Sequence, residues 1–243
     1  MAAGTGAGDT VSCVVLDIEG TTSPAAFVYE QLYPYARSRF THWLAEHRAD
    51  EDIARAMEQV AEQIGEPEPS IGRVVAVLED WSRKDLKITP LKTVQGRIWA
   101  DGFAVGDLTA PFFPDVIPAL RAWRAAGLDL YIYSSGSVGA QRAWFGHTPE
   151  GDLRPLLAGY FDTENAGQKK AAESYRAIAG VIGCAATRIV FLSDSVGELD
   201  AARAAGWRTA GVRRPGEPGF ALGVGDHPEL SSFAELCYRS GDL

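Results

Sequence analysis

The chain has 243 residues, 46% of them hydrophobic and 23% charged, which suits one large α/β domain or a core with a smaller inserted domain. Its formal net charge of -9 argues against a nucleic-acid partner, because phosphate backbones favour proteins with an excess of Lys and Arg. No apolar stretch reaches the ~20 residues of a membrane span, so no membrane partner is expected either.

The start of the chain predicts no folded element. Residues 1–10 are rich in Ala and Gly and lack the basic start and apolar run of a signal peptide, so we expect a flexible tail. The three cysteines, Cys13, Cys184 and Cys237, are scattered and form no Cys-x-x-Cys pair. This pattern argues against disulfides and zinc, and it predicts buried thiols in a reducing, cytoplasmic location.

Short apolar runs predict a sheet of buried parallel strands. Helical patterns, each stopped by a glycine, alternate with the later strands. This alternation predicts an α/β fold with a doubly wound parallel sheet. The expected strands are residues 11–18, 128–133, 188–192 and 207–212, and the expected helices are residues 118–126, 169–182 and 197–205.

Residues 25–110 break this alternation. They hold amphipathic helical patterns without any strand-like run. We therefore expect a helical cap domain of residues 25–110, inserted into an α/β core of residues 11–24 and 111–243. The expected cap helices are residues 25–47, 50–64, 70–84 and 91–104.

Two acids follow the first expected strand, at the edge of a parallel sheet where ligands bind. Asp17 and Glu19 are two residues apart, so in an extended chain their carboxylates share one face, and Gly20 then lets the chain turn away. Neighbouring carboxylates repel unless a cation lies between them or one is protonated. One could attack phosphorus while the other acts as acid and base. A strand end with two solvated acids is the alternative.

Groups suited to phosphate follow later strands. Ser134 and Ser135 end the second strand and offer hydroxyls and main-chain N–H groups before a helix, although a plain helix cap would explain either serine. Lys169 and Lys170 stand at the expected start of a helix, where a cation is unfavourable for the helix dipole. A lysine there would instead serve an anion, or it is simply solvated.

The next expected strand ends in a further acid. Asp194 could bind magnesium, which prefers a few carboxylates together with water and phosphate oxygens. Glu198 completes the pattern Ser195-x-x-Glu198, which is typical of a capping box at a helix start. A role for Glu198 in the site and a role in capping are compatible.

Each of these features is weak alone, and their order carries the signal. An acid pair, then serine, then lysine, then aspartate after successive strands resembles the signature of the haloacid dehalogenase superfamily. The position of the cap, directly after the first acid pair, resembles one cap class of that superfamily. The resemblance implies a magnesium-dependent phosphohydrolase.

A closer resemblance is carried by Glu19, since most phosphatases of the superfamily have Asp there. Residues 17–22 (Asp-Ile-Glu-Gly-Thr-Thr) are similar to the first motif of the enolase-phosphatases of methionine salvage, and the likeness extends over nearly the whole chain from Val11. Lys169, rather than Lys170, fits the family's distance to residues 173–175. Other similar segments are residues 89–92, 95–99, 113–116, 131–137, 145–147, 160–163 and 191–194.

The family implies a bifunctional reaction. A 2,3-diketo-5-methylthiopentyl-1-phosphate would be enolised and then dephosphorylated to an acireductone. By position, Asp17 would form an aspartyl-phosphate and Glu19 would act as acid and base. Phosphate would be held by Ser134, Ser135 and Lys169.

The family also implies one magnesium ion per chain. Its ligands would be Asp17, Glu19 through the main-chain carbonyl, and Asp194, with Glu198 outside these direct contacts. Gln95 and Trp99 are candidates for facing the methylthio tail.

Two alternatives stay open at this point. A phosphatase of the same fold could act on another small phosphate ester such as a sugar phosphate, because fold does not fix substrate. A phosphate-binding module without turnover is the non-enzyme alternative, which the intact Asp17, Lys169 and Asp194 argue against. In either case we expect a monomer that takes a small-molecule ligand.

Overall fold

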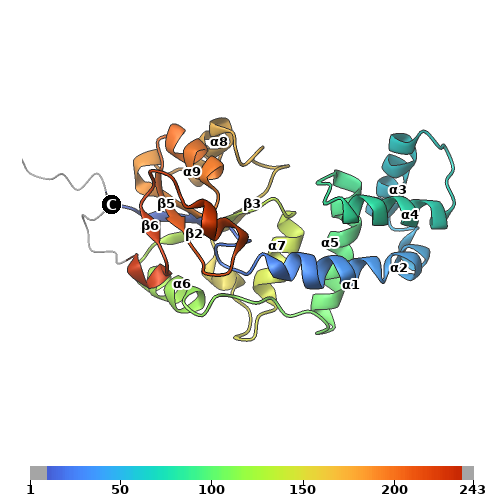
Figure 1. Cartoon of the computed structure of the whole chain (residues 1–243), viewed down its shortest axis with the longest axis horizontal. Helices are drawn as coiled ribbons and strands as arrows, with labels where there is room; N and C mark the ends of the chain where they lie inside the picture. The colour runs from blue at the N-terminus through green and yellow to red at the C-terminus, as the bar shows by residue number, and fades with distance from the viewer. Residues whose placement is uncertain (1–9, 237–243) are drawn as a thin grey trace, which may run out of the picture.

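The structure is a computed structural model that describes residues 10–236. Nearly all of the expected N-terminal tail, and Cys237, lie outside the described residues. Figure 1 shows an α/β unit, with a group of helices extending from one side of it. Within residues 10–236, no helix is both long enough and apolar enough to cross a bilayer.

The α/β unit contains a parallel sheet with the strand order β3-β2-β1-β4-β5-β6. The predicted parallel α/β fold is therefore confirmed, with β1 at the centre. Two strands, β3 and β6, were not predicted, because they are only 3 and 2 residues long and lack a continuous buried run. The strands are β1 Cys13–Leu16, β2 Asp129–Tyr133, β3 Gly159–Phe161, β4 Ile189–Ser193, β5 Arg208–Val212 and β6 Glu229–Leu230.

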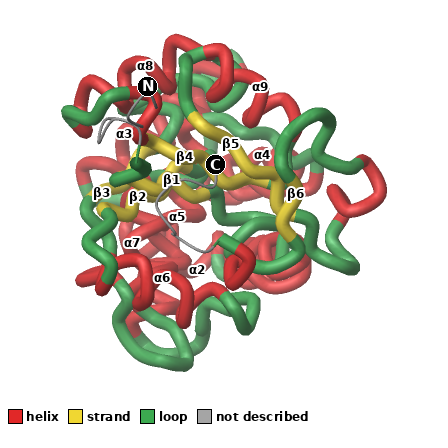
Figure 2. Tube along the Cα trace, turned by 90° about the vertical axis from the view of Figure 1, so that its left-hand side faces the viewer, coloured by secondary structure: helices red, strands yellow, loops and turns green. Residues whose placement is uncertain are grey.

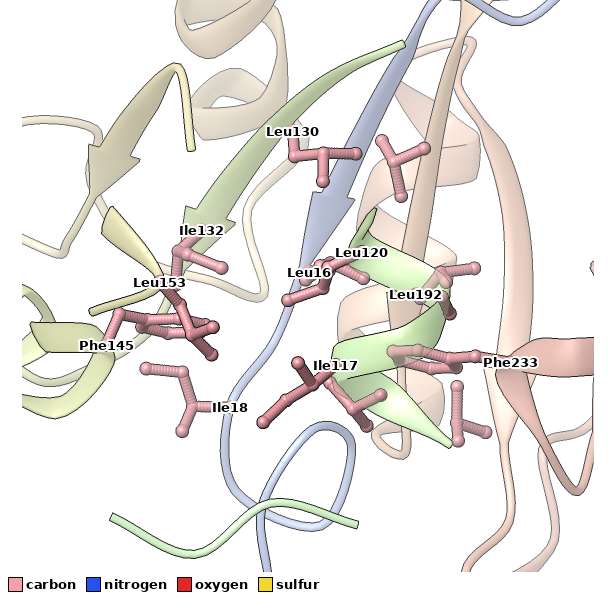
Figure 3. Close-up of a cluster of buried hydrophobic side chains, with 14 of the residues drawn as sticks. Leu16, Ile18, Ile117, Leu120, Leu130, Ile132, Phe145, Leu153, Leu192 and Phe233 are labelled. Atoms are coloured by element: carbon pink, nitrogen blue, oxygen red, sulfur yellow. The ribbon is translucent and has the colours of Figure 1, made fainter. Parts of the chain in front are cut away.

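Helices cover both faces of this sheet, as Figure 2 shows with α8 and α9 above it and α6 and α7 below. Alternate side chains of β1 serve the two faces: Val14 and Leu16 join the core beneath α6 and α7, while Cys13 and Val15 join the core beneath α8 and α9. Figure 3 shows the first of these cores around Leu16. The helices are α6 Val116–Ala125, α7 Val138–Gly146, α8 Ala172–Ile182 and α9 Val196–Ala204.

Short 3-10 turns join these elements. They are η2 Arg154–Leu156, η3 Ala186–Arg188, η4 Pro218–Leu222 and η5 Phe233–Glu235.

The segment between β1 and α6 is helical in the structure. Its buried apolar residues, from Ala36 to Ile98, form a core of their own, separate from the two cores of the sheet. The segment packs on the α/β unit through contacts between α5 and α7. The boundaries of the proposed cap at residues 25 and 110 stay a prediction. Its helices are η1 Val28–Leu32 (a π-helix), α1 Tyr33–Arg37, α2 Phe40–His47, α3 Glu51–Ile64, α4 Ile71–Arg83 and α5 Thr89–Ala104.

The single helix expected over residues 25–47 is wrong, because the structure divides it. Pro34 has no N–H to give to a helix bond, and a π-helical turn precedes it. The hydroxyl of Ser38 donates to the carbonyl of Tyr35 at 2.9 Å, and α2 starts afresh after Arg39. Short polar side chains that bond the preceding turn in this way favour bends and helix ends.

Candidate active site

The carboxyl ends of the three central strands bring the predicted site residues to one edge of the sheet. Asp17 follows β1 directly. The two strands that pair with β1 also end next to site residues: β2 is followed by Ser134, and β4 is followed by Asp194. The main-chain N–H of Asp17 donates to the carbonyl of Leu192 in β4 at 3.0 Å, which extends the pairing to the point where the site begins. The parallel topology thus gathers residues that are far apart in sequence.

Asp17 is buried, with 3% of its surface exposed. The ammonium of Lys169 donates to its Oδ1 at 2.5 Å. The hydroxyls of Thr21 and Ser193 reach its Oδ2 only at 3.5 Å each, so that oxygen has weak partners. A buried carboxylate with one well-bonded oxygen and one weakly bonded oxygen is a suitable nucleophile, because the second oxygen keeps its lone pairs available.

The loop after β1 is shaped by Gly20. Its φ of +74° is in the left-handed region that favours glycine, and its N–H donates to the carbonyl of Ser23 at 2.8 Å. A Cβ at this position would lie 2.4 Å from Oδ2 of Asp194. The main-chain N–H of Asp194 donates in turn to the hydroxyl of Thr21 at 3.0 Å. The loops that carry Asp17 and Asp194 therefore pack directly on each other.

Lys169 lies in the turn before α8, not on the helix, so the expected helix start at residue 169 is wrong. Because neither lysine is on the helix, rotation around a helix axis does not separate Lys169 from Lys170. The structure separates them by burial instead: Lys169 has 6% of its surface exposed, whereas Lys170 is exposed. The phenol of Tyr175 donates to the carbonyl of Lys169 at 2.7 Å and holds this turn against α8.

The ammonium of Lys169 pairs with two carboxylates, Asp17 at 2.5 Å and Glu198 at 2.7 Å. Burial alone would lower the pKa of Lys169, but the neighbouring charges of Asp17 and Glu198 outweigh it and raise the pKa. The side chain therefore stays an ammonium at neutral pH and can neutralise an anion beside Asp17.

The expected capping box at Ser195 and Glu198 is wrong, because the side chain of Ser195 makes no capping hydrogen bond at the start of α9. The carboxylate of Glu198 instead contacts Lys169 and accepts from the hydroxyl of Ser193 at 3.0 Å. Burial raises the pKa of Glu198 to about 7, and the nearby Lys169 limits the rise. Glu198 is thus joined to Asp17 through Lys169, which contacts both carboxylates.

Two further carboxyl groups, those of Asp194 and Glu19, lie near the negative charge of Asp17. Burial, and then the neighbouring Asp17, raise the pKa of Asp194 to about 7. Burial and Asp17 also raise the pKa of Glu19. Carboxylates that destabilise one another in this way are favourable binding groups for a cation.

The fit to a divalent metal rests on this donor set. Among residues 10–236 no group of three His, Cys, Asp or Glu side chains already forms a metal cage. Mg²⁺ does not need one, since it commonly takes one or two carboxylates with waters and phosphate oxygens. Asp17 and Asp194, which repel each other at adjacent strand ends, fit that requirement.

Ser134 and Ser135 precede α7 without capping it. The cap is Ser137, whose hydroxyl accepts from the N–H of Ala140 at 3.3 Å. The hydroxyl of Ser134 accepts from the N–H of Gly136 at 3.2 Å. Capping is therefore not what these two serines do, and both line the cavity described next.

A cavity that opens to solvent is lined by residues of both the helical segment and the sheet edge. Its lining includes polar groups of Glu19 and residues 134–137, and much of the remaining wall is apolar or aromatic. The residues Asp17, Lys169 and Asp194 do not line this cavity themselves. The apolar part is formed by Ile18, Val28, Leu32, Leu86, Phe103 and Trp144, together with Trp99.

Several lining residues match or extend the sequence predictions. Gln95 and Trp99, proposed from the family resemblance, both line the cavity. Leu86, Lys87 and Lys92 also line it and were not assigned any role. Lys92 belongs to the motif at residues 89–92, which was an available signal, whereas Lys87 had no signal beyond its nearness to that motif.

Comparison with known proteins places the chain clearly. A family model described as haloacid dehalogenase-like hydrolase matches residues 11–206. A protein of Streptomyces avermitilis named enolase-phosphatase E1 is 60% identical over 93% of this chain and 95% of its own length. A protein of the same name from Pseudomonas aeruginosa is 45% identical over 93% of this chain and 98% of its own.

Solved structures agree. The UTR4 protein of Saccharomyces cerevisiae is similar to this chain with a TM-score of 0.78 and 32% sequence identity, over 93% of this chain and 100% of that one. The CbbY protein of Rhodobacter sphaeroides shares the fold at 18% identity, with a TM-score of 0.58 over 93% of this chain and 96% of that one.

Proposed function

Since the chain belongs to the haloacid dehalogenase-like hydrolases, and within them to the enolase-phosphatase E1 family, we propose that the cluster around Asp17 is its active site. The reaction is that of the family: 2,3-diketo-5-methylthiopentyl-1-phosphate is enolised and dephosphorylated to acireductone and phosphate. The observation that carries the site assignment is the buried contact of Lys169 with Asp17, next to a cavity whose lining includes Glu19, Ser134 and Ser135.

Asp17 is the nucleophile in this proposal. Its weakly bonded Oδ2 attacks phosphorus and forms an aspartyl-phosphate, while Lys169 holds Oδ1 and neutralises charge on the phosphate. Glu19, whose pKa is raised by burial and by Asp17, can hold a proton and deliver it to the leaving oxygen. It then removes a proton from the water that hydrolyses the aspartyl-phosphate.

Mg²⁺ would be held by Asp17, Asp194 and the main-chain carbonyl of Glu19, and when bound it would lower the repulsion between Asp17 and the phosphate. The hydroxyls and N–H groups of Ser134 and Ser135 would hold the other phosphate oxygens. Glu198 keeps Lys169 charged and in place through its contact at 2.7 Å. One metal ion per chain, the monomeric state and the cytoplasmic location remain predictions.

The cavity suits the rest of the substrate. Phosphate beside Ser134 and Ser135 would leave the apolar residues Trp99, Phe103 and Trp144 to receive the methylthio tail. Burying that tail excludes water from the enolate, which would otherwise be quenched. A sugar phosphate is disfavoured where the wall is apolar, because hydroxyls placed among Trp99, Phe103 and Trp144 would lose their hydrogen bonds to water.

A substrate panel tests this function. Purified enzyme with Mg²⁺ would be given the diketo phosphate, a hexose phosphate and p-nitrophenyl phosphate, and initial rates would be compared. We expect the highest kcat/KM for the diketo phosphate, with enol absorbance and free phosphate appearing in equal amounts. A higher kcat/KM for the hexose phosphate would favour the rival phosphatase, and phosphate binding without any turnover would favour the binding module.

A further inference from the structure

The loop between α4 and α5 contributes to the wall of the cavity. Leu86 and Lys87 in this loop line the cavity together with Glu19 and Ser135. Leu86 is 39% exposed, and its side chain lines the cavity beside Lys87. The phosphoryl-transfer groups described above do not account for a cation on this wall.

Lys87 belongs to a cluster of three polar side chains. Its ammonium donates to Oδ1 of Asp85 at 2.6 Å and to the phenol oxygen of Tyr33 at 2.7 Å. The phenol of Tyr33 donates to the same Oδ1 of Asp85 at 2.6 Å. Three mutual contacts of this length fix the direction of the lysine side chain.

The backbone of this loop is held in an unusual conformation. Asp85 has a φ of +53°, and it is the only non-glycine residue with a positive φ among residues 10–236. Such a conformation is disfavoured for a residue with a side chain and persists where the surroundings enforce it. The bonds from Tyr33 and Lys87 supply that enforcement. Strain at a ligand cavity is typical of a residue that aims a functional group.

The charge of Lys87 decides what it can do. Burial alone would lower its pKa, but the hydrogen bonds to Asp85 and Tyr33 outweigh burial and raise it. An ammonium that is so well paired does not act as a base at neutral pH. It can donate hydrogen bonds to a developing oxyanion, and such donors are among the strongest contributors to catalysis.

We propose that Lys87 is a catalytic residue of the enolisation step, donating to the substrate's C2 carbonyl oxygen, with Tyr33 and Asp85 as its positioning residues. This inference rests on the proposed function. A carboxylate, for which Glu19 lines the same cavity, takes the proton from C1. The C–H electrons form the C1–C2 double bond, and the carbonyl π electrons move onto oxygen. The proton then passes from Glu19 to that oxygen, and Lys87 stays an ammonium throughout.

The other lysine of the wall has a different contact. The ammonium of Lys92 donates to the hydroxyl of Thr163 at 3.2 Å and so connects α5 to the loop after β3. The ammonium of Lys87 instead bonds to Tyr33 and Asp85 of the helical segment, and it is carried by a loop that lines the cavity. Lys87 is therefore the better candidate for a group that meets the carbonyl.

The test compares two reactions of the same variant. Lys87→Gln should lower kcat for enol formation from the diketo phosphate by ~10²-fold or more, the loss expected for one oxyanion donor. Hydrolysis of p-nitrophenyl phosphate, which needs no enolisation, should fall far less. Lys84→Gln is the matched control, because Lys84 belongs to the same segment and its ammonium pairs with Asp80 on the surface. It should change neither rate.

Positioning is tested by two conservative changes and one rescue. Asp85→Asn tolerates the left-handed backbone, and Tyr33→Phe keeps the ring, so both should fold. Each variant should slow enol formation, although by less than Lys87→Gln does. In each variant, hydrolysis of the aryl phosphate should be slowed less than enol formation. Lys87→Arg keeps a charged donor and should recover part of the lost rate.

The outcomes separate this inference from the function on which it rests. Equal loss of both activities in Lys87→Gln would overturn the inference and make Lys87 a structural or phosphate-binding residue. If the wild-type enzyme hydrolyses p-nitrophenyl phosphate but forms no enol from the diketo phosphate, the proposed function fails instead. A wild-type rate of enol formation in Lys87→Gln would also overturn the inference.

Discussion

Lys169→Met is the perturbation whose consequences the structure defines most closely. Methionine keeps most of the length and apolar body of lysine but removes the ammonium. In the wild-type chain that ammonium contacts Asp17 and Glu198, and the three side chains are only 6%, 5% and 12% exposed. The variant therefore leaves two buried carboxylates without their cation.

The expected size follows from this burial. Removing one partner of a buried ion pair costs about 3–5 kcal/mol, which is a large part of the 5–15 kcal/mol stability of a typical domain. Because the pKa of Lys169 is raised, its stabilisation is complete below the ~10.4 of an unfolded lysine and is lost only at higher pH. The deficit is therefore fully present at pH 7. Loss of a cation at the transferring phosphate should lower kcat by ~10³-fold or more.

The assay pairs urea unfolding at pH 7 with phosphate release, and Lys170→Met is the control. Lys170 is exposed, so its variant should unfold within about 0.5 kcal/mol of wild type and keep its activity. If Lys169→Met unfolds like wild type, or if Lys170→Met shows the larger loss of kcat/KM, the assignment of Lys169 to the site is refuted.

Three further predictions concern the metal and the acid pair. Asp194→Asn should abolish the rise in melting temperature that Mg²⁺ gives the wild type, which is worth about 2.7 kcal/mol at 100 times Kd. Without metal at pH 8 the same variant should be more stable than wild type, because Asp194 has a pKa raised to about 7 and its ionised form destabilises the fold above that pH. An unchanged Mg²⁺ titration would contradict the role of Asp194 as a metal ligand. Glu19→Gln should lower phosphate release by roughly 10²–10⁴-fold, and Glu19→Asp should slow enol formation more than hydrolysis of an aryl phosphate; equal slowing of both would confine Glu19 to phosphoryl transfer. Gly20→Ala should lower stability by about 1–3 kcal/mol and raise the Mg²⁺ requirement, because its Cβ would lie 2.4 Å from Asp194 Oδ2 at a φ of +74°; wild-type melting and Mg²⁺ dependence would argue against the close packing of the two loops.

The elements that could be predicted from sequence are those whose burial shows in a continuous apolar run. β1, β2, β4 and β5 are of this kind, and each was expected within a few residues of its bounds. β3 and β6 are short edge strands whose pairing depends on the finished sheet, so no local pattern marks them. The break between α1 and α2 depends on one hydroxyl bond of Ser38, which propensity does not reveal.

The candidate site shows the same division. Asp17, Ser134 and Asp194 were expected together, because parallel strands end at one edge. The choice of Lys169 came from family spacing, whereas the expected helix start at residue 169 was wrong because the turn before α8 is irregular. In the cluster of Tyr33, Asp85 and Lys87, Tyr33 is 54 residues from Lys87 and 52 residues from Asp85. No local sequence pattern links positions so far apart, so the cluster could be recognised only in the structure.

The central claim is that Asp17 carries the phosphoryl group during turnover. Enzyme turning over the diketo phosphate would be quenched in acid and treated with borohydride, which reduces an aspartyl-phosphate to homoserine. Peptide mapping should then find homoserine at position 17, and none should appear in the Asp17→Asn variant or in enzyme without substrate. Active turnover with position 17 unchanged, or with the reduction at another carboxylate such as Asp194, would contradict the account.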